Sequence, residues 1–195
     1  MNQLRKLYDW VLHWAETPYA VPALIILAFA ESSFFPIPVD VLLIAMALSI
    51  PKYSFRYAAY TSLFSVLGGV GGYIIGFYFM QYIGQSIIDF YGYQEQYQSL
   101  AQTFQEHNFI AILVAALTPI PYKVFTITAG AANANFMEFM GASILGRSLR
   151  FFAVSALIYY FGERIKDFID RYFNILSIIF AVLLVGGFIL IKYLF

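Results

Sequence analysis

Residues 31–43, ESSFFPIPVDVLL, decide the fold, because they place two carboxylates and two prolines inside an otherwise apolar part of the chain. The apolar runs on either side, residues 19–35 and 39–50, are each shorter than the roughly 20 residues that a helix needs to cross a bilayer. Proline removes a backbone donor and breaks or kinks a helix. The stretch therefore predicts two short helical arms joined by a break. This pattern is typical of a re-entrant hairpin, which enters and leaves the membrane on one side.

The composition of the 195-residue chain indicates an integral membrane protein. Hydrophobic residues make up 62% of it and charged residues only 11%, whereas soluble domains carry about 25% charged residues. The formal net charge is zero, so the sequence gives no reason to expect a nucleic-acid partner. Because the chain has no cysteine and its two histidines lie far apart, we expect no metal site and no cofactor.

The other apolar segments complete an all-α membrane domain that extends over the whole chain. We expect an interfacial amphipathic helix over 2–16, a first repeat over 19–84, an external loop or helix over 85–108, a second repeat over 109–162 and a final transmembrane helix over 173–194. Within the repeats, residues 57–80 and 137–161 are long enough to span a bilayer. Gly68, Gly72 and Gly76 share one face of the first spanning helix, where they permit close packing.

Two similar motifs, PIPVDV at 36–41 and PIPYKV at 119–124, indicate that these units repeat each other. Each motif lies between two short apolar arms and is followed by a polar turn and then by a spanning helix. If the N-terminus is cytoplasmic, the first break enters from inside and the second from outside. Such inverted repeats are typical of secondary transporters. We expect the tips of the hairpins to be formed by the four prolines, Pro36, Pro38, Pro119 and Pro121.

The distribution of basic residues supports a cytoplasmic N-terminus, because cytoplasmic loops carry an excess of Lys and Arg. In this orientation the residues inside are Arg5, Lys6, Lys52, Arg56, Arg164, Lys166 and Arg171. Lys192 alone lies outside. The expected external segments, 81–108 and 133–138, contain no basic residue.

Five charged residues at membrane depth are the candidates for a functional site: Glu31, Asp40, Lys123, Arg147 and Arg150. Each costs roughly 2.5–3.5 kcal/mol on insertion scales, and such residues usually face a cavity or a partner. Arg147 and Arg150 share a helix face, and they either bind a lipid phosphate or neutralise Glu31 and Asp40. Asp40 and Lys123 occupy equivalent positions in the two motifs. Their opposite charges could therefore meet across a pseudo-two-fold axis.

Taken together, the motifs resemble the DedA superfamily, also called SNARE-associated Golgi or VTT-domain proteins. The resemblance rests on the glutamate before FPIP, on GGYIIG at 71–76 and on TPIPYKVFTITAG at 118–130, while GRSLRFF at 146–152 resembles the YqaA-like branch. It implies two re-entrant hairpins, a bacterial inner-membrane location and a role in moving lipids between leaflets. Some members are linked to the proton motive force and to envelope integrity. Glu31 and Asp40 match the acidic positions of the family's first hairpin.

The chain departs from the family pattern in its second hairpin. Ala116 and Tyr122 stand where family members commonly carry arginines, so Arg147 and Arg150 are candidates to supply the missing charge. We expect translocation of phospholipid or polyprenyl-phosphate headgroups. In this interpretation the three basic side chains hold phosphate and the two carboxylates respond to protons.

Two other functions remain open: a proton-coupled antiporter for ions or small solutes, and a non-catalytic factor for membrane-protein assembly or envelope integrity. We do not expect an enzyme, since the chain lacks HExxH, any cysteine and a Ser–His pair at useful spacing. The expected partners are membrane lipids and protons. The sequence leaves the lipid, the direction of movement and the oligomeric state open.

Overall fold

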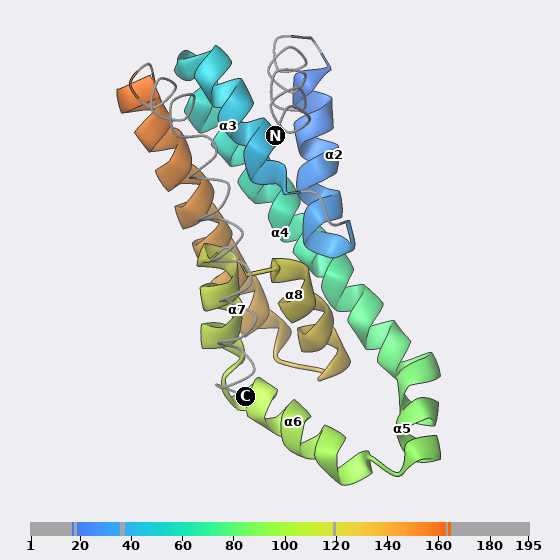
Figure 1. Cartoon of the computed structure of the whole chain (residues 1–195). Coiled ribbons are helices and arrows are strands. Elements are labelled where there is room, and N and C mark those ends of the chain that lie inside the picture. Colours follow the sequence, from blue (N-terminus) through green and yellow to red (C-terminus); the bar gives the residue numbers. More distant parts are fainter. Residues whose placement is uncertain (1–16, 18, 36–37, 119, 163, 165–195) are drawn as a thin grey trace, which may run out of the picture.

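The helices are seen in a computed structural model, which describes residues 17, 19–35, 38–118, 120–162 and 164 (Figure 1). They are α2 (Ala20–Ser33), α3 (Val39–Ser49), a 3-10 turn (Pro51–Tyr53), α4 (Ser54–Phe79), a π-helical turn (Met80–Gly84), α5 (Gln85–Tyr91), α6 (Gln94–Glu106), α7 (Asn108–Leu117), α8 (Tyr122–Ala131) and the helix Phe136–Gly162. These residues contain no strand, so the all-α class is confirmed for them. The predicted helices 2–16 and 173–194 lie outside the described residues.

Two helices are long and apolar enough to cross a membrane, as the sequence predicts. The first is a continuous run of 41 residues, Pro51–Tyr91, which includes α4 and α5, and the second is Phe136–Gly162, with 27 residues. At about 1.5 Å per residue the second measures about 40 Å, more than the ~30 Å of a hydrocarbon core. The two pack together at one end, where the ring of Phe55 lies 6.4 Å from that of Phe152.

The four shorter apolar helices form two hairpins that point toward each other. In Figure 1, α2 and α3 run antiparallel in the upper half of the molecule, while α7 and α8 run antiparallel in the lower half, and the two breaks lie near mid-height. The central helix α4 packs against α2 and α3 of the first hairpin and against α8 of the second. One long helix thus supports both hairpins.

Glycines on one face of α4 allow this close approach. A Cβ atom at Gly68 would collide with the backbone carbonyl of Phe29 in α2, and one at Gly76 would collide with the carbonyl of Ile127 in α8. Gly72 lies between them, against the side chain of Thr126. Because backbone atoms cannot move aside as a flexible side chain can, these contacts require a residue without a Cβ.

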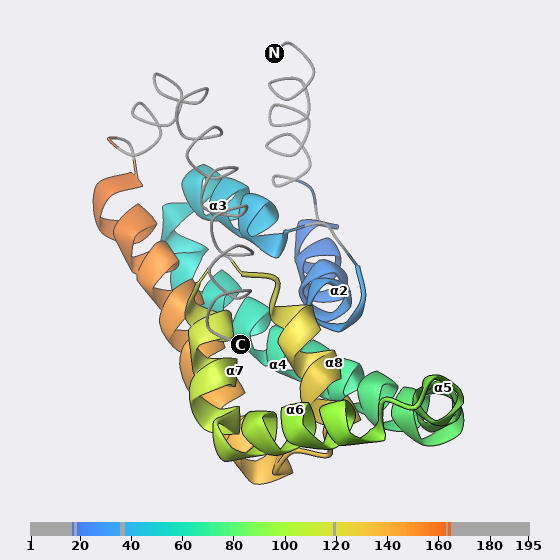
Figure 2. The ribbon, with the colours of Figure 1, turned by 60° about the horizontal axis from the view of Figure 1, so that its bottom comes forward.

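The segment predicted as an external loop or helix, 85–108, is mostly helical. In Figure 2, α6 crosses below α7 and α8. Phe104 is buried there. The hydroxyl of Tyr97 donates to the carbonyl of Ala131 at 2.7 Å, and the amide of Gln105 donates to that of Ala132 at 2.6 Å. Since the last carbonyls of a helix have no partner within it, α6 caps the end of α8.

Two apolar clusters lie on either side of a polar layer. The first gathers side chains of α2, α3 and α4 around Phe151. The second gathers side chains of α7 and α8 around Phe139. The charged residues singled out from the sequence lie between the clusters, where the hairpins meet.

Candidate functional site

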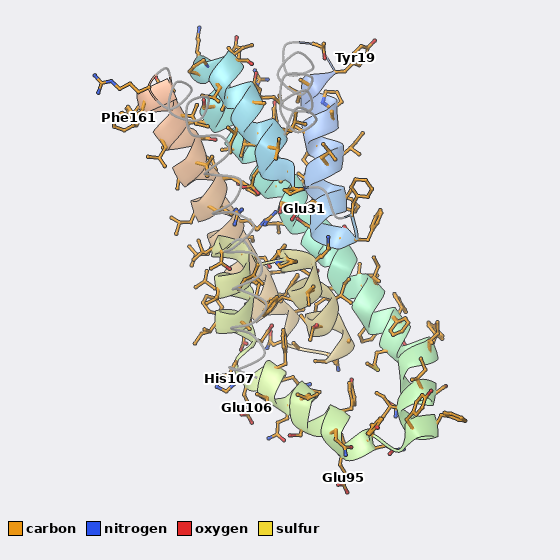
Figure 3. The ribbon with its side chains drawn as sticks, viewed as in Figure 1. Tyr19, Glu31, Glu95, Glu106, His107 and Phe161 are labelled. Carbon is orange, nitrogen blue, oxygen red and sulfur yellow. The ribbon has the colours of Figure 1, made fainter. Side chains whose placement is uncertain are left out.

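The five candidate residues come from four different helices and lie in this polar layer. They are Glu31 in the last turn of α2, Asp40 in the first turn of α3, Lys123 in the first turn of α8, and Arg147 and Arg150 in the helix Phe136–Gly162. Figure 3 shows Glu31 midway between one end of the molecule, marked by Tyr19 and Phe161, and the other, marked by Glu95 and His107.

Arg147 and Glu31 form a buried ion pair. The Nη2 atom of Arg147 lies 2.7 Å from Oε2 of Glu31, and the two side chains are 3% and 17% exposed. The same guanidinium donates to the hydroxyl of Ser32 at 3.2 Å and, from Nε, to the hydroxyl of Ser65. A buried charge needs both a counter-ion and hydrogen bonds. Here α2 and α4 supply them to the last described helix.

Two aromatic rings lie close to the Arg147 guanidinium. Its Cζ atom lies 4.8 Å from the ring centre of Tyr122 and 4.6 Å from that of Phe151, which are cation–π distances. The Tyr122 hydroxyl in turn donates to the hydroxyl of Ser143 at 2.6 Å. Arg147 therefore contacts the second hairpin as well as the first.

Arg150 forms a more open and bidentate pair with Asp40. Its Nε and Nη2 atoms lie 3.2 and 3.0 Å from the two carboxylate oxygens, and the side chains are 17% and 23% exposed. Its Nη1 atom donates to the carbonyl of Thr118, which follows α7, at 2.6 Å. A cation is favoured at the carbonyl end of a helix. Arg150 thus joins the start of α3 to the end of α7.

Lys123 also links the hairpins, but without a carboxylate. Its Nζ donates to the carbonyl of Phe35 at 3.0 Å, and no described carboxylate lies within ion-pair distance of it. The expected meeting of Asp40 and Lys123 is therefore wrong for these residues. Asp40 pairs instead with Arg150, whose planar fork makes two parallel charge-assisted bonds to the two carboxylate oxygens.

The prolines of the two motifs occupy equivalent places as far as they are described. Pro38 and Pro121 each directly precede the second arm of a hairpin, with extended ψ values of 125° and 100°. Pro36 and Pro119 lie outside the described residues. Since a proline at the start of a helix needs no hydrogen-bond acceptor, each hairpin can resume its helix at once after the break.

Sequence reasoning missed the neutral side chains that hold Arg147. The hydroxyls of Ser32 and Ser65 lie 2.7 Å apart and both accept from the guanidinium. A signal was present, because Ser32 directly follows Glu31 and Ser65 precedes the glycine face by one helical turn. Among the described residues, no three His, Cys, Asp or Glu side chains gather to hold a metal ion.

The chain is similar to a known protein family and to bacterial proteins. Residues 37–160 match the family described as VTT domain. The chain is 34% identical over 192 residues to an uncharacterized protein of Haemophilus influenzae, a match that covers 98% of this chain and 100% of that protein. It is also 34% identical over 164 residues to an uncharacterized protein of Histophilus somni, covering 84% and 85% of the two chains. No solved structure matches. Because the matched range holds α3, both long helices, the second hairpin and four of the five charged residues, the chain belongs to the VTT-domain family, the DedA or SNARE-associated family of membrane proteins.

Proposed function

We propose that the protein moves phosphate-bearing headgroups, of phospholipids or of polyprenyl phosphates, between the leaflets of the bacterial inner membrane. The observation that carries the proposal is the polar layer in which the two hairpins meet. It holds three cationic and two anionic side chains between two apolar clusters. In secondary transporters, substrate sites lie near the bilayer midplane between broken helices.

The lengths of the hairpin arms support a re-entrant placement. The arms α2 and α3 have 14 and 11 residues, which correspond to about 21 and 16 Å, well short of the ~30 Å of a hydrocarbon core. Beside a spanning α4, such arms reach only the middle of the membrane. The second hairpin approaches from the opposite side, as in an inverted repeat.

The charges at the two ends support a cytoplasmic N-terminus. Lys52 and Arg56 lie at the start of α4, and Arg164 closely follows the helix Phe136–Gly162, which ends beside Pro51. This is also the end at which α2 begins (Figure 1). The opposite end is built from α5 and α6, and residues 81–122 contain no Lys or Arg. By the positive-inside rule, the first end faces the cytoplasm.

The cations of the polar layer are not equally available to a phosphate. Arg147 is 3% exposed and is enclosed by Glu31, hydroxyls and two rings. Arg150 is 17% exposed, and Lys123 has a carbonyl but no described carboxylate as its partner. The layer carries one cation more than it has anions, and a headgroup phosphate would balance that charge. We therefore assign first contact to Lys123 and second contact to Arg150.

Protonation offers a way to couple this binding to the proton motive force. If Asp40 takes a proton, the bidentate bond to Arg150 weakens and the guanidinium becomes available to phosphate. Glu31 and Arg147 form a second, deeper pair with the same chemistry. An antiporter for ions would use the same pairs without phosphate, and it is the alternative that the experiment has to distinguish. The proposal requires no covalent chemistry.

Lipid movement into the inner leaflet of liposomes tests the proposal directly. We would reconstitute the purified protein with a fluorescent phospholipid and measure the fraction accessible to an impermeant quencher, with and without a pH gradient. We expect Lys123→Gln to slow movement at least tenfold and Lys123→Arg to retain most of it. Arg56→Gln is a matched control, because Arg56 carries the same charge but contacts Tyr60 outside the polar layer.

The outcomes separate the alternatives. Well-folded protein that moves no phosphate-bearing lipid, but exchanges protons for one cation, would establish the antiporter instead. Protein that does neither would favour the assembly factor. Lipid movement that is equally fast in wild type and in Lys123→Gln would contradict the assigned contact.

A further inference from the structure

Two buried hydroxyls in the described part of the chain have no hydrogen-bond partner. They belong to Ser62 in α4 and Ser155 in the helix Phe136–Gly162, and these residues are 5% and 0% exposed. Other buried hydroxyls in these helices are satisfied; Thr61, for example, donates to the carbonyl four residues earlier. The remaining unpartnered atom of this kind among the described residues is the side-chain oxygen of Asn108, far from both serines in sequence. A buried polar group without a partner costs roughly 1–3 kcal/mol.

Both serines lie on helix faces that continue from the polar layer. Ser155 follows Arg147 by eight residues, on the stripe that also holds Phe151, and Ser62 precedes Ser65 by one turn. Because Ser65 accepts from Arg147, these two stripes face each other. The rise of a helix places Ser62 about 4.5 Å from Ser65 along α4, and Ser155 about 12 Å from Arg147 along its own helix. With Ser65 and Arg147 bonded to each other, the two serines are roughly 8 Å apart along the axis.

Ser62 and Ser155 lie on the same side of the Arg147 level, toward one end of the molecule. The chain enters α4 there through Pro51, and the last described helix ends beside it, since a Cβ atom at Gly162 would lie 3.7 Å from Pro51. Lys52, Arg56 and Arg164 belong to this end. It is therefore the end that the positive-inside rule assigns to the cytoplasm.

We propose that Ser62 and Ser155 bind a short chain of water molecules, which connects the Arg147–Glu31 pair with the cytoplasmic end. Hydroxyl–water steps of about 2.8 Å bridge the roughly 8 Å of axial distance between the two serines with two or three waters. Each water satisfies a hydroxyl that otherwise has no partner, as buried waters typically do. The binding of water stands independently of lipid transport, whereas its role as a proton route rests on the proposed function.

The packing beside Arg147 is tight in the opposite direction, so we expect the water chain to extend from it toward the cytoplasmic end. Toward that end, the hydroxyls of Tyr122 and Ser143 bond to each other at 2.6 Å. Beside them a Cβ atom at Gly146 would lie 2.6 Å from that of Ala116, which leaves no room for water.

Other ionisable groups share the layer with Glu31 and would influence its proton. They are Asp40 on α3, Tyr122 and Lys123 on α8, and Arg147 and Arg150 on the last described helix, while α4 contributes the hydroxyl of Ser65. For this reason the test measures the accessibility of water directly, and not the pH dependence of transport.

The absence of cysteine from the whole chain makes this measurement possible. Ser62→Cys and Ser155→Cys each introduce a single thiol of nearly the same size. Ag⁺ is close to the size of a water molecule and reacts with thiols, so it probes narrow aqueous paths. Membrane vesicles of either orientation would be treated with Ag⁺, and the unreacted thiols would be counted with a fluorescent maleimide after denaturation.

Matched controls come from equally buried alanines. Ala45→Cys in α3 and Ala142→Cys in the last described helix place a thiol at positions that are 0% exposed and apolar. We expect both serine-derived thiols to react at least tenfold faster than these controls, and only from the side of Lys52 and Arg56. Each variant would first be shown to elute as wild type in size-exclusion chromatography.

Two results would overturn the inference. Reaction at the rate of the alanine-derived thiols would show that the serine sites are dry, and reaction from both sides would show that access is not one-sided. A positive result would stand even if the protein moved no lipid in liposomes, so failure of the proposed function is distinguishable from failure of this inference. Because the two thiols are tested in separate variants, either one suffices if the other fails to fold.

Discussion

Neutralising Glu31 should destabilise the fold more than neutralising Asp40, although both carboxylates pair with an arginine. The reason is burial, since Arg147 is 3% exposed and Arg150 is 17% exposed. Removing one partner of a fully buried pair costs about 3–5 kcal/mol, because the other charge is left uncompensated. For Glu31→Gln we expect a smaller loss in the free energy of unfolding, about 2–3 kcal/mol. Glu31 is partly exposed, and in the variant the hydroxyls and rings would still contact Arg147. For Asp40→Asn we expect about 1 kcal/mol, closer to an exposed pair.

Thermal unfolding in detergent micelles measures this difference. For a chain of this size, 1 kcal/mol corresponds to about 2–4 °C in Tm, so Glu31→Gln should lower Tm by about 4–12 °C and Asp40→Asn by about 2–4 °C. The double variant Glu31→Gln/Arg147→Met should lose less than the sum of the single variants, since removing both charges leaves none unpaired. Additive losses in the double variant, or a larger loss for Asp40→Asn, would refute the argument from burial.

Three further predictions concern packing and turns. Gly76→Ala should abolish folding, because a Cβ atom there would collide with the carbonyl of Ile127. Gly141→Ala should fold as wild type does, since its Cβ atom would make only an ordinary contact at 3.7 Å. The yield of monodisperse protein after purification distinguishes the two variants. Gln105→Ala removes the bond to the carbonyl of Ala132, so it should cost about 1 kcal/mol and speed amide hydrogen exchange at the end of α8. Unchanged exchange would mean that the Gln105 bond does not stabilise this end of α8. Asn133 has a φ of 51°, a conformation that glycine adopts easily and a β-branched residue does not. Asn133→Gly should therefore keep the Tm of wild type, whereas Asn133→Val should lower it. Equal Tm values for the two variants would contradict the expected strain.

The helices were predictable because their signals are local. The prolines before α3 and α8 and the short apolar runs beside them follow from the sequence alone, and so do the two long apolar helices. Each of these features depends on residues that are neighbours in the chain, through hydropathy or through the backbone chemistry of proline.

The pairing of the charges was not predictable in the same way. The motifs suggested that Asp40 and Lys123 would meet, because they hold equivalent positions. Their actual partners depend on which helices pack together, and Arg150 reaches Asp40 from a helix 110 residues away in sequence. Ser32 and Ser65 stand beside Glu31 and the glycine face in the sequence, but that position does not say which cation they meet, since Arg147 lies at least 82 residues away from them in sequence.

The two arginines differ in how many helices hold them in the polar layer. Arg147 is surrounded by α2, α4 and α8, so freeing it would break contacts with three helices at once. Arg150 joins Asp40 to the carbonyl that follows α7, and both bonds lie at the ends of hairpin arms. Opening the Arg150 pair would therefore release the start of α3 from the last described helix, while the Arg147 pair and the bond from Lys123 to Phe35 still join the hairpins. A headgroup that enters beside Lys123 would meet the more exposed arginine first. If Asp40 is protonated, the phosphate could take its place on Arg150 without leaving a charge unpaired.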